Sequence, residues 1–392
     1  MKVTLSLTHR CNLACGYCYA GHSRKPDMEL STAQRSIDTA LGSLHAGKTL
    51  FLGLFGGEPL LRFDLVREIT VYARRRAAEM SLPISIGITT NGTLVSPAVL
   101  DFVSQEGISL CFSIDGPEDV HDRSRRHRDG RGSFPEVVGN LQRALERLGV
   151  VEVNAVLGPD TLADVPRTVS FFTDLGVRVI HLSPHIRAAW PRQSYRCLQD
   201  VYAQLAEHYI ACYERGVEIA VNLIDSKAVL FVKGGYSPSD MCAMGDGEWA
   251  VAPSGNLYPC ERFIGEDSDS TWMLGDIWSG FDPARRCALR LKRGNHREEC
   301  ATCPDRRFCM NWCGCTNYYL SGRTDIPAPV LCAMEKAAIN AARYVFESLV
   351  TGGNDLFADH LFNYVSAEAQ CTDRAPRNTE RGQVVAFQLR AP

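Results

Sequence analysis

Three cysteines near the start of the chain, Cys11, Cys15 and Cys18, follow a Cys-x3-Cys-x2-Cys spacing. They come directly after an apolar run from Val3 to Leu7 that predicts a β-strand. Three thiolates on one tight loop can hold three irons of a four-iron, four-sulfur cluster and leave the fourth iron open. The loop therefore predicts a cluster with a position for a further ligand.

A zinc site and a set of buried thiols are the alternatives for this loop. Zinc sites usually draw four ligands in two pairs, whereas this loop has three cysteines and no nearby fourth. His9 and His22 lie close enough in sequence to keep zinc open as an interpretation.

The loop resembles that of the radical S-adenosylmethionine (SAM) superfamily, which usually has an aromatic residue before the last cysteine, here Tyr17. The resemblance implies that the open iron takes the amino and carboxylate groups of SAM. It also implies that an electron from the cluster splits the sulfonium to give a 5'-deoxyadenosyl radical.

Later segments resemble the SAM-binding edges of the peptide-modifying branch of that superfamily. A Gly-Gly-Glu-Pro element follows the second predicted strand, and two glycines let the main chain approach a ligand closely. An arginine suits a carboxylate because its fork can bond it twice. Each segment is also a turn former, which is the structural alternative. The resemblance implies SAM contacts from Tyr17, Gly56, Gly57, Glu58, Asn91, Ser113, Asp115 and Arg125.

Up to about residue 232, short β-branched runs alternate with amphipathic segments of helical length, which predicts repeated βα units and parallel strands. The fold class is therefore α/β, and the resemblance implies a partial, open (β/α)6 barrel of the TIM type. Chemistry in such barrels sits at the C-terminal ends of the strands. We expect helices to start at Ser31, Ser96 and Ser133. The expected strands are Val3–Leu7, Leu50–Phe55, Ile84–Thr89, Ser109–Ile114, Val151–Leu157 and Val177–Leu182, with Val217–Leu223 as a possible added strand.

Composition places the chain among ordinary globular proteins. It has 392 residues, 45% of them hydrophobic, and a net charge of -3, without the basic excess of a nucleic-acid binder. No run of about eighteen apolar residues and no signal-peptide pattern is present, so we expect no membrane or export role and a cytoplasmic location. We also expect no leader-binding module before the first strand.

A second cysteine field begins after a Gly-Ser-Pro-rich stretch near residue 235. Its order resembles the seven cysteines of the SPASM domain, an auxiliary-cluster module of many radical SAM enzymes, here with a small hairpin and helices. The resemblance implies a first auxiliary cluster on Cys242, Cys260 and Cys313, and a second on Cys300, Cys303, Cys309 and Cys332. A zinc ribbon is the alternative for the tighter spacings.

The first auxiliary set is one ligand short. Some relatives place a further cysteine where this chain has Tyr236, so either an iron stays open or another residue, such as Cys315, closes the cluster. Glu261 follows Cys260, where sulfatase-maturing relatives carry an aspartate thought to accept a proton. Burial that raised the pKa of Glu261 would suit a general base, and a surface ion pair is the alternative.

Two other polar groups are candidates with structural alternatives. The run from Arg123 to Arg131 is the densest positive charge of the chain and predicts either a solvated loop or a surface that attracts an acidic peptide. His181 and His185 end the sixth predicted strand and are candidates to line the substrate cavity. We divide the chain into a barrel (1–235), an auxiliary-cluster domain (236–350) and a partly flexible extension (351–392).

Together these features predict a radical SAM enzyme with three [4Fe-4S] clusters that removes hydrogen from a ribosomally made peptide and forms a thioether or carbon–carbon cross-link. The expected partners are the peptide or protein substrate, an electron donor such as flavodoxin or ferredoxin, and a separate leader-peptide-binding protein. The alternatives are anaerobic sulfatase maturation to formylglycine, a SAM dehydrogenase acting on a small molecule, and a non-catalytic metal-binding protein.

Overall fold

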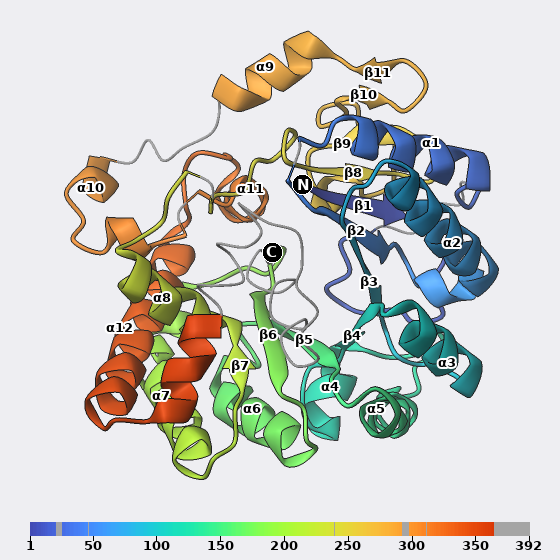
Figure 1. The fold of residues 1–392 in the computed structure, drawn as a ribbon. Coiled ribbons are helices and arrows are strands. Elements are labelled where there is room, and N and C mark those ends of the chain that lie inside the picture. The colour runs from blue at the N-terminus through green and yellow to red at the C-terminus, as the bar shows by residue number, and fades with distance from the viewer. Residues whose placement is uncertain (21–25, 46, 239, 292–297, 311, 364–392) are drawn as a thin grey trace.

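The computed structural model contains one continuous sheet with helices packed around it (Figure 1). Strand order is β11-β10-β9-β8-β1-β2-β3-β4-β5-β6-β7. Every pairing from β1 to β7 is parallel, which confirms the partial α/β barrel. The structure describes residues 1–20, 26–45, 47–238, 240–291, 298–310 and 312–363. His22 lies outside this part of the chain.

The barrel strands lie close to the predicted ranges, because each is an apolar run that the sheet buries. Helices between successive strands cover the outside of the sheet, as expected for parallel pairing. The strands are β1 (Lys2–Ser6), β2 (Leu50–Phe55), β3 (Ile84–Thr90), β4 (Ser109–Ser113), β5 (Glu152–Leu157), β6 (Val179–Pro184) and β7 (Ala220–Val221). The helices are α1 (Leu30–Gly42), α2 (Phe63–Glu79), α3 (Pro97–Glu106), α4 (Glu118–Ser124), α5 (Phe134–Leu148), α6 (Val165–Asp174), α7 (Leu198–Glu214) and α8 (Asn222–Lys233).

The seventh strand pairs with β6 as predicted but has two residues. The Asn222 side chain ends the pairing. Its Oδ1 accepts from the Leu182 N–H at 2.8 Å and its Nδ2 donates to the Leu182 carbonyl at 3.1 Å. The side-chain amide thus takes the place of a backbone partner in the strand pairing, and the chain continues into α8.

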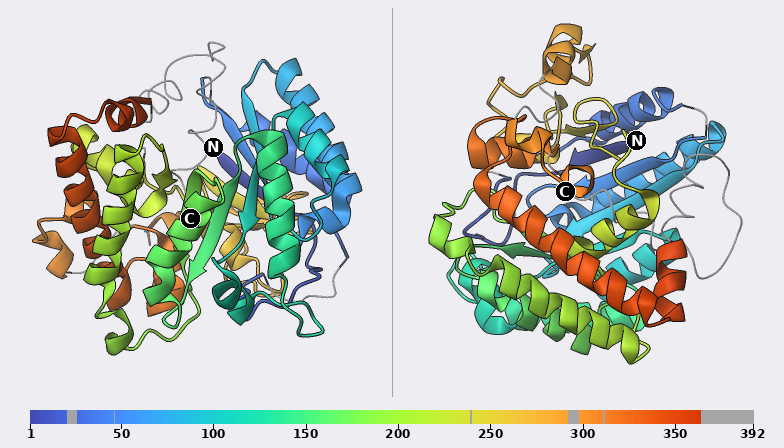
Figure 2. Two further views of the ribbon diagram at one scale, coloured as in Figure 1. Left: turned by 90° about the horizontal axis from the view of Figure 1, so that it is seen from below. Right: turned by 90° about the vertical axis from the view of Figure 1, so that its left-hand side faces the viewer.

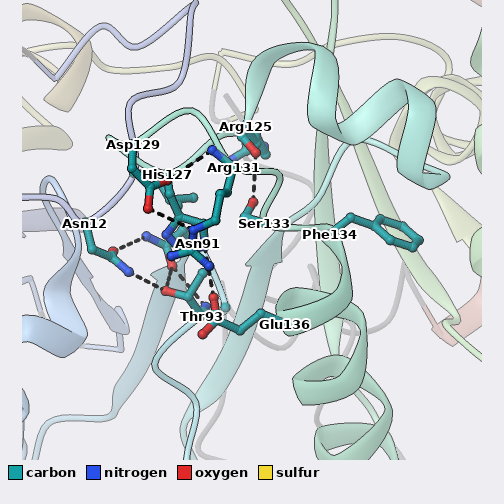
Figure 3. Close-up of polar contacts among 12 residues, drawn as sticks. Asn12, Asn91, Thr93, Arg125, His127, Asp129, Arg131, Ser133, Phe134 and Glu136 are labelled. Atoms are coloured by element: carbon teal, nitrogen blue, oxygen red, sulfur yellow. Dashed lines mark hydrogen bonds and ion pairs between the residues drawn. The ribbon is translucent and has the colours of Figure 1, made fainter.

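Predicted helix starts have mixed outcomes. Ser96 caps α3 as predicted, because its Oγ accepts from the Val99 N–H at 3.4 Å. The start at Ser31 is wrong, since α1 begins at Leu30 after Glu29. Ser133 precedes α5 as predicted, but its hydroxyl donates to the Arg125 carbonyl at 2.8 Å and makes no cap bond (Figure 3).

The C-terminal part extends the barrel sheet. The predicted hairpin is β8 (Glu248–Val251) and β9 (Asn256–Tyr258), and β8 pairs in parallel with β1. The remaining strands are β10 (Gly275–Asp276) and β11 (Gly280–Phe281). Helices α9 (Pro283–Leu291), α10 (Glu298–Ala301), α11 (Gly314–Ser321) and α12 (Pro329–Thr351) follow.

The longest helix of the described chain, α12, closes this part of the structure. It lies against α7 and α8 on the outside of the barrel (Figure 2). The division at residue 235 and the separate extension stay predictions, and the polar stretch from Arg374 to Arg381 lies outside the described residues. Among the described helices, none is long and apolar enough to cross a membrane.

Candidate active site

One cavity of about 300 Å³ lies inside the barrel, and the N-terminal cysteine loop forms part of its wall. Cys11, Cys15 and Cys18 all line it, so the structure brings the three predicted ligands to one chamber. The loop follows the C-terminal end of β1, where such barrels place chemistry. Six of the eight predicted SAM contacts also line the cavity: Tyr17, Gly56, Gly57, Asn91, Ser113 and Arg125.

The two glycines after β2 allow main chain to lie directly against the segment that leads into the cysteine loop. The Gly57 N–H donates to the Thr8 carbonyl at 2.7 Å, and the Glu58 N–H donates to the Arg10 carbonyl at 2.8 Å. A Cβ at Gly56 would lie 2.5 Å from the Thr8 carbonyl oxygen, and one at Gly57 would overlap the Arg10 carbonyl. The Gly-Gly pair thus sets the position of the loop at the cavity.

Glu58 lies behind the cavity wall, since it is fully buried and does not line the cavity. Its carboxylate accepts from the Asn91 N–H at 2.7 Å, the Thr90 hydroxyl at 2.8 Å and the Leu60 N–H at 3.0 Å. Burial raises the pKa of Glu58 to about 7 despite these bonds. In this structure the side chain joins the end of β2 to the end of β3, and its predicted contact with SAM stays a prediction.

Asp115 also lies behind the wall and holds two cavity residues. It accepts from the Tyr17 hydroxyl at 2.5 Å and forms an ion pair with Arg125 at 3.2 Å. The Val156 N–H donates to the same carboxylate at 3.0 Å. The Arg125 guanidinium lies over the Tyr17 ring, 5.2 Å from its centroid. Asp115 therefore positions an aromatic ring and a buried cation next to the cysteine loop.

The arginine-rich loop packs on the cysteine loop, and four of its arginines, Arg123, Arg126, Arg128 and Arg131, are exposed. Leu13 and His127 form an antiparallel bridge, and Arg128 donates to the Cys11 carbonyl at 2.9 Å. Arg131 forms an ion pair with Asp129, and Figure 3 shows both residues close to His127. Among the described residues, Arg123, Arg125 and Arg126 have protein partners as well. The exposed arginines agree with the predicted solvated loop, and the contacts of His127 and Arg128 hold this loop against the cysteine loop.

Glu261 reaches the same cavity from the C-terminal part of the chain, next to Lys2 and Arg262. Burial alone would raise the pKa of Glu261, but the charges of Lys2 and Arg262 lower it. The condition that burial raises this pKa is therefore not met, because β1 brings Lys2 beside the carboxylate, which the sequence did not show. Glu261 and Glu248 in turn raise the pKa of Lys2, although burial opposes that shift.

The structure gathers the first auxiliary set and adds Cys315 to it. The Cys313 and Cys315 sulfurs lie 3.6 Å apart, and Cys260 forms a side-chain hydrogen bond with Cys315. Cys242 lies close enough to interact with both Cys313 and Cys315. Its thiol donates to Glu248 at 3.2 Å.

The second auxiliary set surrounds a separate cavity of about 30 Å³. All four predicted cysteines line it: Cys300, Cys303, Cys309 and Cys332. Glu335 lies at the same cavity and forms an ion pair with buried Lys227 at 2.7 Å. The two sets of cysteines thus lie at separate places, and their assignment to two clusters stays a prediction.

Two buried side chains, His181 and Glu152, meet in the cavity. The sequence suggested His181 as a cavity residue but gave no role to Glu152. His181 Nε2 and the Glu152 carboxylate form a hydrogen bond at 3.0 Å, and both residues line the cavity. His185 lines it too, which agrees with the prediction for both histidines. Period-two alternation along β5, which places Glu152 and Asn154 on the face opposite Val153, was the signal that could have found the carboxylate.

Comparison with known proteins matches residues 5–172 to the radical SAM superfamily. An uncharacterized protein of Methanocaldococcus jannaschii is 36% identical over 129 residues, which covers 33% of this chain and 43% of that protein. The PqqA peptide cyclase of Granulibacter bethesdensis is 26% identical, over 93% of this chain and 94% of that protein. The serine-type anaerobic sulfatase-maturating enzyme of Klebsiella aerogenes is 23% identical, over 77% and 76%.

The fold is similar to that of native anSMEcpe with bound AdoMet and a peptide. The TM-score is 0.76 at 18% identity, covering 90% of this chain and 99% of that chain. At this identity the likeness concerns the fold, which here includes both the barrel and the cysteine-rich part.

Proposed function

This chain is a radical SAM enzyme, and from that premise we propose that it modifies a ribosomally synthesised peptide by a thioether or carbon–carbon cross-link. The observation that carries the proposal is the single cavity shared by the cysteine loop and by Glu261, which follows auxiliary ligand Cys260. A substrate in this chamber would contact both ends of the site. The full-length likeness to a peptide cyclase supports a peptide as the substrate.

We propose Cys11, Cys15 and Cys18 as the ligands of a [4Fe-4S] cluster, with SAM held along the Gly56–Gly57 edge and by Arg125. The residues fit such a group, because the three cysteines and both glycines line one cavity. When bound, the cluster and SAM supply a 5'-deoxyadenosyl radical that removes a hydrogen atom from the substrate. Arg125 can bind the SAM carboxylate from beside Tyr17.

For the first auxiliary cluster we propose Cys315 as the fourth thiolate beside Cys242, Cys260 and Cys313. The 3.6 Å separation of the Cys313 and Cys315 sulfurs supports this set. Arg262 lies within 3.9 Å of the Cys315 sulfur and supplies a positive charge to a thiolate there. The second auxiliary cluster would use Cys300, Cys303, Cys309 and Cys332. This proposal is supported by the small cavity, which all four cysteines line.

Iron and sulfide analysis tests the fourth ligand. Cys315→Ala should retain its iron but give one auxiliary cluster an altered electron paramagnetic resonance (EPR) signal that responds to added thiol or cyanide, because an iron becomes open. Glu248→Gln is the matched control, since the Glu248 carboxylate, which accepts from the Cys242 thiol, is the other candidate ligand there. An altered signal in the glutamine variant, with none in Cys315→Ala, would assign the position to Glu248.

Anaerobic sulfatase maturation is the second candidate function. The observation in its favour is the position of Glu261 on the cavity wall, next to Cys260. The positive charges of Lys2 and Arg262 keep this carboxylate ionised, so that it is available to accept a proton.

An external reductant such as flavodoxin or ferredoxin, and a leader-peptide-binding protein, are the further partners that we propose for the cross-linking reaction.

The first experiment measures 5'-deoxyadenosine formed from SAM by the anaerobically reconstituted protein with dithionite, against Cys15→Ala. We expect formation by the wild type alone. Peptides encoded beside the gene then distinguish the two reactions. A cross-link removes two hydrogens without creating an aldehyde, whereas formylglycine reacts with a hydrazine probe. Wild-type protein with full iron and no SAM cleavage, even with these peptides, would contradict the proposal.

A further inference from the structure

The side chain of Asn91 links the end of β3 to the cysteine loop. Asn91 is buried, and its Nδ2 lies 3.6 Å from the Cys11 sulfur as a hydrogen-bond donor. The same nitrogen donates to the Asn12 Oδ1 at 2.8 Å. Both amide hydrogens of Asn91 are therefore directed at the cysteine loop.

A closed set of hydrogen bonds determines which way this amide points (Figure 3). The Thr93 hydroxyl donates to the Asn91 Oδ1 at 2.7 Å, and the Asn12 Nδ2 donates to the Thr93 hydroxyl oxygen at 2.7 Å. The Thr93 backbone N–H also donates to the Asn91 Oδ1, at 3.0 Å. Because a backbone N–H can only donate, the atom facing it must be the oxygen, and the nitrogen must face Cys11.

The main chain of Asn91 is held as well. Its N–H donates to the Glu58 carboxylate at 2.7 Å, so the residue is anchored on the side away from the cavity. A second donor, the Leu13 N–H, lies 3.4 Å from the same sulfur. Asn91 thus supplies a side-chain N–H to a sulfur whose other hydrogen bond comes from the main chain of its own loop.

We propose that Asn91 is a positioning residue that raises the reduction potential of the cluster held by Cys11. Reduction places additional negative charge on the cluster and its thiolates, and an N–H directed at sulfur stabilises that charge. Without this donor the oxidised cluster is harder to reduce. The inference rests on the proposed cluster at Cys11, Cys15 and Cys18, and it gives the Asn91 side chain a role other than the predicted contact with SAM.

The test is anaerobic EPR potentiometry of the reconstituted full-length protein. The relevant cluster is identified as the one whose signal changes when SAM is added. Asn91→Leu, which has no donor and a similar size, should make reduction less favourable by about threefold to tenfold. For a one-electron couple this is a midpoint shift of about 30 to 60 mV to more negative values. Asn91→Asp places a negative charge there and should shift the midpoint further in the same direction.

Thr93→Val is the matched control. It removes the hydroxyl from the same hydrogen-bond set but keeps the backbone N–H that orients the Asn91 amide, so the midpoint should stay within the error of the wild type. An unchanged midpoint in Asn91→Leu, or an equal shift in Thr93→Val, would overturn the inference. If Asn91→Leu does not assemble the cluster, Asn91→Ala, which also lacks a donor and adds no charge, carries the same test. Absence of any SAM-sensitive signal in the wild type would instead contradict the proposed function.

Discussion

His360 predicts a strong pH dependence of stability at the outer edge of the barrel. It lies in the helical segment 355–363 and is 3% exposed. Its Nε2 is 2.7 Å from the Asp225 carboxylate, and its Nδ1 is 2.9 Å from the Glu218 carboxylate. Tyr209 donates to the same Asp225 oxygen at 2.8 Å. Two carboxylates on opposite sides of one ring favour the imidazolium, which has a hydrogen on each nitrogen.

The magnitude follows from the pKa of this imidazole. Burial alone would lower the pKa of His360, but the hydrogen bonds to Asp225 and Glu218 raise it from 6.5 to about 9. The contribution to stability is therefore complete below pH 6.5 and is lost as the pH rises through 9. At about 1.36 kcal/mol per pKa unit it reaches about 3 kcal/mol, of which about 2.5 kcal/mol remains at pH 7 and about 0.2 kcal/mol at pH 9.5.

The assay compares thermal unfolding of the wild type and His360→Gln under anaerobic conditions at pH 7 and pH 9.5. For 392 residues the unfolding entropy is about 0.8 kcal/mol/K, so the difference in Tm should be about 3 °C larger at pH 7. His208→Gln is the control, because burial lowers the pKa of His208 and leaves it neutral at both pH values. A His360→Gln effect of equal size at both pH values would refute the reasoning.

Three further predictions concern the active site. Gly57→Ala should abolish SAM cleavage, because the added Cβ would overlap the Arg10 carbonyl. Gly139→Ala should leave the rate unchanged, since the nearest atom to its added Cβ, on the Arg143 side chain, is 3.9 Å away. The rate of 5'-deoxyadenosine formation measures both effects. Arg125→Met should cost about 3 to 5 kcal/mol of stability by leaving Asp115 buried without its cation. Adding Asp115→Asn should restore most of this loss in denaturant unfolding, and no recovery would contradict the charge-burial account. Relative to Glu58→Gln, the free energy of unfolding of the wild type should fall by about 3 kcal/mol between pH 4.5 and pH 8. The unfolded chain ionises Glu58 above about pH 4.5, whereas the folded chain keeps it protonated up to about pH 7. Urea unfolding at several pH values measures this change, and a constant difference would contradict it.

The cysteine spacings and the strand pattern could be predicted because they depend on local sequence. Cys11 with its two partners, and the Gly56–Gly57 turn, each form a short segment whose residue types state their chemistry. The βα alternation likewise follows from runs of apolar residues that a parallel sheet buries on both faces. Ser31 was assigned wrongly because the first helix begins without a side-chain cap, so the local signal had no structural counterpart.

Contacts between segments far apart in the chain were decided only by the tertiary structure. Pairing of β8 with β1 brings Lys2 close to Glu261, and its charge lowers the pKa of that carboxylate although burial raises it. The cation that faces a buried carboxyl group depends on this strand pairing and not on its sequence neighbours. In the same way, the end of β3 places the Asn91 amide on the Cys11 sulfur. The sequence by itself thus determined which groups are available for chemistry, and the fold decided which of them meet, because charge and hydrogen-bond energies depend on distance through space.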